Sequence, residues 1–376
     1  MTTAPTANPP TAPTATPTTD PTAAPAPPAA IAPTPVELRS AELERRIAQD
    51  PGRFRVLTGD RPTGPLHLGH YFGTLRNRVR LQELGVDVFV LIADLQVLTD
   101  RDTADRLQEY TEGLLLDHLA LGIDPARSTV FHHSAVPALN QLLLPFLSLV
   151  SVAELGRNPT VKDEIAHSRQ SAVSGLMFTY PAHQAADILF CKGNLVPVGQ
   201  DQIPHVELTR TIARRFNERY GNVFPEPEAL LSPAPLLLGT DGGKMSKSRA
   251  NSIPLSASAD ETARLIRGAT TDADRHITYD PVRRPGVSSL VLLAALCLER
   301  DPHEVAAEIG DGGGAALKRT VTDAVNGHLA PFRARRAEYA KDLAYVRSVL
   351  HAGNERANAR AEATLAEVRE AMGAFR

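Results

Sequence analysis

Two short segments hold the side chains with the clearest chemical potential. Residues 62–70 read Pro-Thr-Gly-Pro-Leu-His-Leu-Gly-His, so a Pro/Gly turn leads into two histidines that flank a glycine at the start of a helical stretch. Residues 242–248 read Gly-Gly-Lys-Met-Ser-Lys-Ser, so two lysines follow a pair of glycines. The first segment could cradle a nucleotide, and the second could bring two movable cations to a polyphosphate. Together they predict an enzyme that acts at the α-phosphate of ATP.

The histidines of the first segment, His67 and His70, lie on one face of a helical turn because they are three residues apart. An isolated pair of this kind could equally be two surface histidines. Their place behind a strand and a tight turn favours phosphate binding, since a helix N-terminus offers free N–H groups and the positive end of the helix dipole. Gly69 has no Cβ and lets a ribose or base approach the backbone closely.

The lysines of the second segment, Lys244 and Lys247, could belong to an ordinary basic surface loop. The two preceding glycines predict a mobile loop, and Ser246 and Ser248 add hydroxyl donors. Adenylyl transfer depends mainly on positioning and on neutralising phosphate oxygens, which two closing ammonium groups can do. Neither segment contains a carboxylate pair, a Ser/His/Asp set or a nucleophilic cysteine, so we expect no covalent enzyme intermediate.

Alternating strands and helices must position these segments. We expect strands at 54–59, 86–94, 129–132 and 195–199, and helices at 36–49, 66–84, about 101–121 and from 203 through Arg219. The nearly all-apolar stretch at 86–94 is typical of a parallel strand that is buried on both faces. The fold class is therefore α/β, a Rossmann-like doubly wound parallel sheet. Ligands bind at the carboxyl ends of such strands, where residues 59–64 would lie.

The composition changes twice along the chain. Residues 1–35 consist mainly of Thr, Ala and Pro and are expected to form a disordered tail outside the fold. Strand signals vanish after about residue 255, which predicts a catalytic domain at 36–255 and an all-helical domain at 256–376. The three glycines at 312–314 are expected in a loop between two helices, and they lack the Lys-Ser/Thr ending of a phosphate loop.

Bulk properties narrow the class of protein. A chain of 376 residues can build two domains, and a formal net charge of −3 gives no global sign of nucleic-acid binding. The apolar surroundings of Cys191 and Cys297 predict reduced thiols and a cytoplasmic location. The sequence shows no secretory signal and no apolar run near the roughly 18 residues that span a bilayer.

Both segments resemble the paired signature of class I aminoacyl-tRNA synthetases, the second letter for letter. Residues 271–290, the Tyr-Pro at 180–181 with Ala-Ala-Asp-Ile-Leu at 185–189, and Val-Pro-Val-Gly-Gln-Asp-Gln at 196–202 resemble the bacterial tryptophanyl-tRNA synthetases. The resemblance implies a homodimeric ligase that activates L-tryptophan with ATP and transfers it to the 3′ end of tRNA(Trp). It also implies that Mg²⁺ arrives with ATP, that the protein itself holds no metal, and that the helical domain binds the tRNA.

The resemblance assigns roles to individual residues. The catalytic set is His67, His70, Lys162, Lys244 and Lys247. The ATP-binding set is Arg61, Pro62, Thr63, Gly69, His70, Gly199, Gln200, Asp201, Lys244, Met245, Ser246, Lys247 and Ser248. The tryptophan-binding set is Leu57, Gly59, Tyr180, Gln184, Asp187 and Gln202, with Asp187 accepting the indole N–H and Tyr180 and Gln202 holding the α-amino group.

The amino-acid specificity depends on a few side chains. Tyr180, Gln184 and Asp187 share one helical face within apolar sequence, which favours a buried polar face over a solvated one. An indole nitrogen only donates, so a carboxylate is its natural counterpart. The same pattern resembles archaeal-type tyrosine enzymes, which carry a second tyrosine where this chain has Leu57. Tryptophan is therefore favoured; a tyrosyl-tRNA synthetase and a catalytically silent, RNA-binding homologue are the alternatives.

Several positions depart from the usual bacterial pattern. Arg61, Thr63 and Gln200 differ at the expected ATP site, and Gln96 and Gln184 differ in the expected amino-acid pocket. These departures indicate a divergent subfamily, in the form of an auxiliary enzyme with altered sensitivity to inhibitors that mimic tryptophan. A basic stretch in the helical domain could contact tRNA phosphates or be a solvated helix face; it comprises Arg333, Arg335, Arg336, Lys341 and Arg347.

Overall fold

The computed structural model describes residues 34–99, 105–167, 173–232 and 237–374. Residues 1–33 of the tail predicted at 1–35 and part of the helix predicted at about 101–121 lie outside these residues, whereas Thr34 and Pro35 of that tail belong to the start of a helix. Helix α1 (Pro35–Gln49) begins behind Thr34, whose hydroxyl accepts from the backbone N–H of Glu37 in a capping box.

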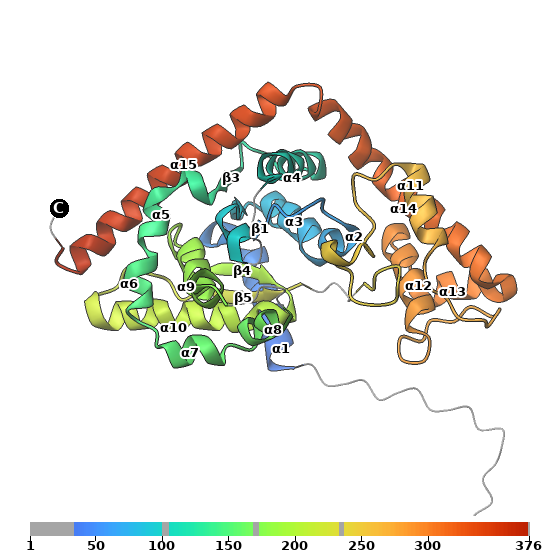
Figure 1. The fold of residues 1–376 in the computed structure, drawn as a ribbon, viewed down its shortest axis with the longest axis horizontal. Coiled ribbons are helices and arrows are strands. Elements are labelled where there is room, and N and C mark those ends of the chain that lie inside the picture. Colours follow the sequence, from blue (N-terminus) through green and yellow to red (C-terminus); the bar gives the residue numbers. More distant parts are fainter. Residues whose placement is uncertain (1–33, 100–104, 168–172, 233–236, 375–376) are drawn as a thin grey trace, which may run out of the picture.

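Five parallel strands form one sheet in the order β3-β2-β1-β4-β5 (Figure 1). Their bounds are β1 (Arg55–Asp60), β2 (Asp87–Ile92), β3 (Ser128–His132), β4 (Leu195–Val198) and β5 (Glu228–Leu231). Strand β1 lies at the centre and pairs with β2 on one side and β4 on the other. The strand order therefore reverses beside β1, which is the point where doubly wound sheets bind ligands. The predicted fold class is confirmed; β5 was not predicted.

Both faces of the sheet are covered by apolar side chains. Val56 and Val88 pack into one core with helices α1, α3 (Arg76–Leu84) and α4 (Leu107–Leu121). Leu57 and Phe89, which follow them in the strands, pack into a second core with α5 (Pro137–Gln141), α9 (Gly175–Leu189) and α10 (Ile203–Tyr220). Burial on both faces explains why these strands are continuously apolar in sequence.

The predicted helix at 66–84 is not continuous. It is divided into α2 (Leu68–His70), a π-helical turn at Tyr71–Leu75 and α3. Between β3 and α9 the chain also forms α6 (Leu143–Leu147), α7 (Val152–Arg157) and α8 (Pro159–His167). Single-turn π-bulges are frequent at functional sites, and this one begins directly after His70.

The remainder of the described chain is helical. It comprises α11 (Ala259–Arg267), α12 (Pro285–Leu298), α13 (Pro302–Ile309), α14 (Gly313–Tyr339) and α15 (Leu343–Ala371). The expected loop at 312–314 is wrong, because Gly313 and Gly314 begin α14. The cost of about 1 kcal/mol per helical glycine is small beside the packing of so long a helix on α12.

The two longest helices diverge from a shared apex at the top of Figure 1. Helix α14 packs against α12 and α4, whereas α15 returns to the sheet and packs on β3 and α5. Both cysteines are free: Cys191 is buried as predicted, and Cys297 is partly buried. None of the helices in the described ranges has the length and apolar character to cross a membrane.

Candidate functional site

A pocket of about 1280 Å³ opens at the carboxyl ends of β1, β2 and β4. It brings together both signature segments, the polar face of α9 and the turn that follows β4 (Gln200–Gln202). The predicted site residues that line it are Leu57, Gly59, Arg61, Thr63, His67, Gly69, His70, Tyr180, Gln184, Asp187, Gly199, Gln200, Asp201, Gln202, Lys244, Met245, Ser246 and Lys247. Residues from distant parts of the chain thus share one cavity.

Three predicted residues do not belong to this lining. Pro62 is buried, and Lys162 is an exposed residue of α8. The side chain of Ser248 lies outside the described part of the structure. The roles expected of these three residues stay predictions.

Backbone hydrogen bonds join the first signature segment to residues 253–255, which follow the second segment. The N–H of Leu68 donates to the carbonyl of Ile253 at 3.1 Å, and the N–H of Leu255 donates to the carbonyl of Leu66 at 2.9 Å. These bonds hold the start of α2 beside residues 253–255 and leave the lysine loop free to face the pocket.

Side-chain contacts then join the two segments directly. The N–H of Gly69 donates to Met245 Sδ at 3.3 Å. The ammonium group of Lys247 donates to the carbonyl of Arg61 at 3.5 Å. The close approach favours glycine, since a Cβ at position 69 would lie 3.1 Å from the His67 ring and 3.2 Å from Met245 Sδ and would displace one of them. The two segments that the sequence predicted to act together are therefore in direct contact.

The rings of the two histidines in the first segment are in contact, tilted by 37° to each other, and uncharged near pH 7. Their ring centroids are 3.6 Å apart. Burial, followed by the charge of Lys247, lowers the pKa of His67 to about 4. Burial, followed by His67, lowers the pKa of His70 to about 3. The His70 Nδ1 accepts from the backbone N–H of His67 at 3.2 Å, which leaves the proton of the neutral ring on Nε2. That N–H is available as a neutral donor to a phosphate oxygen.

The lysine loop is shaped by Asn251, which sequence reasoning missed. The side chain is buried, its Oδ1 accepts from the N–H of Ser246 at 2.9 Å, and its Nδ2 donates to Asp241 Oδ1 at 2.7 Å and to the carbonyl of Lys244 at 3.0 Å. A Cβ at Gly239 would lie 2.4 Å from this amide. An Asn close behind a Gly-rich loop is the sequence signal, because its amide can replace backbone partners in a turn.

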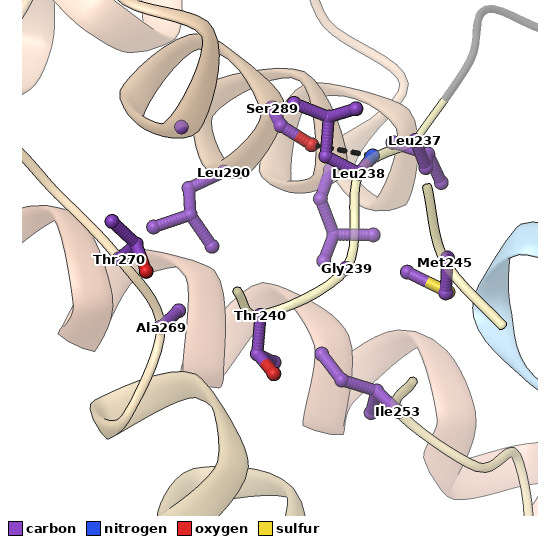
Figure 2. A pocket seen from close by; sticks show the side chains of 12 residues that line it. Leu237, Leu238, Gly239, Thr240, Met245, Ile253, Ala269, Thr270, Ser289 and Leu290 are labelled. Atoms are coloured by element: carbon purple, nitrogen blue, oxygen red, sulfur yellow. Dashed lines mark hydrogen bonds between the residues drawn. The ribbon is translucent and has the colours of Figure 1, made fainter. Parts of the chain in front are cut away.

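A small apolar cavity of about 20 Å³ lies behind Met245 (Figure 2). It is lined by the loop at 237–240 and by α12, and the N–H of Leu238 donates to Ser289 Oγ at 3.0 Å. The cavity has room for about one water molecule, so it is packing space and not a ligand site. The loop that carries the lysines is thereby attached to the helical region.

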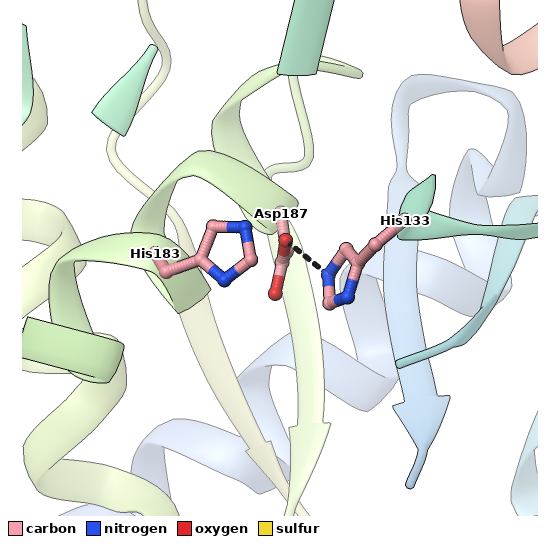
Figure 3. A group of neighbouring side chains, drawn as sticks. All are labelled: His133, His183 and Asp187. Carbon is pink, nitrogen blue, oxygen red and sulfur yellow. Dashed lines mark hydrogen bonds and ion pairs between the residues drawn. The ribbon is translucent and has the colours of Figure 1, made fainter. Parts of the chain in front are cut away.

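The deepest polar group in the pocket is the carboxylate of Asp187, which is 1% exposed. Gln96 Nε2 donates to its Oδ2 at 3.0 Å, and His133 Nε2 lies 2.7 Å from its Oδ1. Figure 3 shows the carboxylate between the rings of His133 and His183. Sequence reasoning missed His133, although its place directly after a strand at the carboxyl edge of the sheet was a signal.

The ligand atoms of His133, His183 and Asp187 also lie within 4.8 Å of one another, close enough for a metal ion. The sequence predicted no metal held by the protein. The His133–Asp187 separation of 2.7 Å is a hydrogen-bond distance, and His183 Nε2 is 2.8 Å from Asn140 Oδ1. We therefore interpret the group as a hydrogen-bonded network.

Tyr180 has a buried partner that was also missed. Its hydroxyl lies 3.1 Å from Nε2 of His205, one helical turn beyond Gln202. Burial lowers the pKa of His205 to about 4, so the ring is neutral near pH 7. The pair fixes the Tyr180 hydroxyl at the pocket wall, next to the half-buried Gln202.

Leu57 and Gly59 of β1 form another part of the pocket wall. Leu57 is 5% exposed and belongs to the second core. A Cβ at Gly59 would lie 2.7 Å from the carbonyl oxygen of Leu91, so only glycine fits this position. An aromatic ring can therefore lie against the β1 backbone.

The predicted basic stretch is engaged within the chain. Arg335 donates to the carbonyl of Ala120 at 2.6 Å, and Arg336 pairs with Asp117 at 2.6 Å. The other three members bond to nearby acceptors as well: Arg333 to Asn326 and Thr262, Lys341 to Glu338, and Arg347 to Glu112. Several of these bonds attach the helical region to α4, which favours a structural role.

Comparisons with known proteins agree with this geometry. The family model described as tRNA synthetases class I (W and Y) matches residues 49–330, more than half of the chain. The chain is 43% identical over 332 residues to the tryptophan–tRNA ligase of Streptococcus pyogenes serotype M1, covering 85% of this chain and 97% of that protein.

Solved structures give the same picture. The tryptophanyl-tRNA synthetase of Campylobacter jejuni, complexed with ADP and tryptophan, is similar with a TM-score of 0.74 and 30% identity, covering 85% of this chain and 100% of that one. The tyrosyl-tRNA synthetase of Archaeoglobus fulgidus, complexed with L-tyrosine, reaches a TM-score of 0.63 at 23% identity, covering 78% and 94%. The second likeness shows a shared fold alone.

Proposed function

Because the chain belongs to the class I tRNA synthetases of the tryptophan and tyrosine group, we propose that it activates L-tryptophan with ATP and transfers it to tRNA(Trp). The observation that carries this proposal is the buried carboxylate of Asp187 in the same pocket as both signature segments. A carboxylate selects the indole N–H, and Leu57 and Gly59 have no side-chain group that could pair with a phenol hydroxyl.

The first step joins tryptophan to the nucleotide. The amino-acid carboxylate attacks the α-phosphorus of ATP in line, forming tryptophanyl-adenylate while pyrophosphate leaves. Lys244 and Lys247 neutralise the charge that grows on pyrophosphate, and the neutral rings of His67 and His70 donate to phosphate oxygens. The Tyr180 hydroxyl, held by His205, receives the α-amino group together with Gln202.

Mg²⁺ bound to the ATP phosphates would add further charge neutralisation. The described side chains of the signature segments that face the phosphates are cationic or neutral: His67, His70, Lys244 and Lys247. Such a donor set fits a metal that is carried by the nucleotide, since Mg²⁺ prefers oxygen ligands.

The second step delivers the aminoacyl group to the RNA. The 2′-hydroxyl of the terminal adenosine attacks the adenylate carbonyl, and AMP leaves. We propose that 36–255 forms the catalytic domain, that 256–376 carries the tRNA contacts, and that the protein works as a cytoplasmic homodimer. The packing of α12 on α14 supports a helical unit, whereas α15 packs back on β3 and α5.

Tryptophan-dependent exchange of pyrophosphate into ATP, without tRNA, tests the proposal. We expect exchange with tryptophan and none with tyrosine at equal concentration. Exchange with tyrosine alone would identify a tyrosine enzyme, and no exchange with either would identify a silent homologue. Charging of a tRNA(Trp) transcript then tests the second step.

Replacing one lysine tests the role of the second segment. Lys247→Ala should lower the exchange rate by about 10²-fold, the scale for losing one preorganised charge. Lys318→Ala is the matched control, because this lysine also donates to a backbone carbonyl, that of Arg267 at 2.9 Å, outside the pocket. An exchange rate within a few-fold of wild type in Lys247→Ala would reject the role. Lys162→Ala tests the third predicted cation, an exposed residue of α8 that does not line the pocket.

The departures in the pocket support the proposal of a divergent, auxiliary enzyme. Gln96 donates to Asp187, and Gln184 lines the same cavity. We expect weaker inhibition by an indole analogue than in an enzyme of the common bacterial type. Equal inhibition constants for the two enzymes would refute this expectation.

A further inference from the structure

We propose that His133 is a positioning residue for amino-acid recognition: its imidazole fixes the Asp187 carboxylate so that it accepts the N–H of the substrate ring. The inference rests on the proposed function, because it concerns how the site recognises the amino acid that this function names. It adds a residue that determines specificity without touching the substrate itself. His133 is 0% exposed and follows β3 directly.

The carboxylate is held on both of its oxygens. His133 Nε2 lies 2.7 Å from Oδ1, and Gln96 Nε2 lies 3.0 Å from Oδ2. Since a carboxylate only accepts, the proton between His133 and Asp187 belongs to the imidazole. The two donors come from the ends of neighbouring strands, β2 and β3, while Asp187 comes from α9. With both oxygens held, the plane of the carboxylate is fixed and its remaining acceptor positions point along fixed directions.

A second buried carboxylate fastens the two donors to each other. Asp94, at the end of β2, is 7% exposed. Its Oδ1 accepts from the N–H of Leu95 at 3.0 Å and from the N–H of Ser134 at 3.2 Å, and its Oδ2 accepts from the Ser134 hydroxyl. Gln96 directly follows Leu95, and His133 directly precedes Ser134. Asp94 therefore fixes the separation of the two donors that hold Asp187.

The neighbouring imidazole does not share this function. The rings of His133 and His183 have centroids 4.7 Å apart, yet His183 Nε2 is directed to Asn140 Oδ1 at 2.8 Å. The cluster thus contains one imidazole hydrogen-bonded to Asp187 and one hydrogen-bonded elsewhere. This difference supplies a matched control within the same buried layer.

Holding the carboxylate has a consequence for selectivity. A fixed acceptor binds a ring N–H well and is left unpaired by a ring that lacks the donor, which raises the cost of the wrong ligand. A carboxylate that can rotate would relax toward other partners and lose part of that discrimination. The expected signature is a change in the ratio of two substrates and not merely in activity.

The test compares tryptophan with an analogue whose indole N–H is replaced by sulfur, 3-(3-benzothienyl)alanine, by kcat/KM in pyrophosphate exchange. His133→Leu should lower the tryptophan-to-analogue ratio by about tenfold, mainly through the KM for tryptophan, because the carboxylate loses one of the two donors that fix its orientation. His133→Gln keeps a donor and should recover most of the ratio. His183→Leu should leave the ratio within about threefold of wild type.

Each outcome has a defined meaning. A wild-type ratio in folded His133→Leu, or an equal fall of the ratio in His183→Leu, overturns the inference and leaves the proposed function intact. Absence of tryptophan-dependent exchange in the wild type instead overturns the proposed function. If His133→Leu does not fold, His133→Asn takes its place, since the shorter amide stops short of Asp187. Loss of wild-type activity with 1,10-phenanthroline would also overturn the inference, by showing that these side chains hold a transition metal.

Discussion

The backbone N–H of Gly69 donates to the thioether of Met245 across 3.3 Å, so the two signature segments are in direct contact. The contact is made at the N-terminus of α2, where phosphate is expected. If the lysine loop moves, it must either break this contact or move together with α2. The geometry makes Gly69 sensitive to any added atom.

Gly69→Ala should impair adenylate formation with little loss of stability. The new methyl group would lie 3.1 Å from the His67 ring and 3.2 Å from Met245 Sδ, so the loop must shift. We expect the exchange rate to fall by about tenfold or more, since small misplacements at a reacting centre are costly. Gly113→Ala on α4 is the control, because nothing lies within 4 Å of its Cβ position. Equal rates in the two variants would contradict the prediction.

Asn251→Ala should raise the KM for ATP. The amide holds three groups of the lysine loop, and its loss leaves the partly buried N–H of Ser246 without that acceptor. We expect an increase of about tenfold in KM for ATP together with a lower melting temperature.

The control for Asn251 is Asn217, which also holds a loop through three hydrogen bonds, to the N–H of Val223 and to the N–H and carbonyl of Phe224. Asn217→Ala should lower the melting temperature and leave the KM for ATP unchanged. If both variants change the KM equally, Asn251 has no specific effect on the loop.

The sequence predicts the fold class because parallel strands buried on both faces leave a continuous apolar pattern, as at 87–92. The sequence also predicts that Asp187 lies on a buried polar face, because helical spacing places it on one side of the helix with Tyr180. His133 is a different case. It lies 54 positions from Asp187, and the packing of α9 against the segments that follow β2 and β3 brings the two together. Contacts that depend on tertiary proximity leave no periodic signal in a single sequence.

The same limit applies to Asn251 and His205. Each is an ordinary polar residue in sequence, and its function depends on which backbone group or hydroxyl it meets. Strand β5, with four residues in a Pro-rich stretch, is too short for a pattern. The long α15 is readily predicted as a helix, but its return to β3 is a property of packing.

Stability should fall as the pH drops below about 6.5. In the folded protein burial lowers the pKa of His67 and of His205 to about 4 and that of His70 to about 3, whereas each is 6.5 in the unfolded chain. The unfolded state therefore binds more protons between these values, and the free energy of unfolding decreases as the pH falls through that window. Each histidine contributes up to about 1.4 kcal/mol per pH unit there.

Urea unfolding from about pH 7.5 to about pH 4.5 checks this prediction. The double variant His67→Gln/His70→Gln should show a shallower decrease than wild type, because two of the histidines whose pKa is lowered in the folded state are absent. Parallel curves for the two proteins would show that these histidines titrate normally in the folded state.

Gly353→Ala should destabilise the protein by displacing α15 from β3. The helix lies directly on the edge strand β3, and a Cβ at position 353 would be 1.8 Å from the carbonyl oxygen of Val130, which no rotamer can relieve. The helix must move outward, and it would weaken the bond from the His132 N–H to Asn354 Oδ1, now 3.2 Å. We expect a loss of at least about 1–3 kcal/mol in the free energy of unfolding, the range for overpacking. Gly327→Ala in α14 faces open space and should be neutral or slightly stabilising, so equal effects in the two variants would place α15 away from β3.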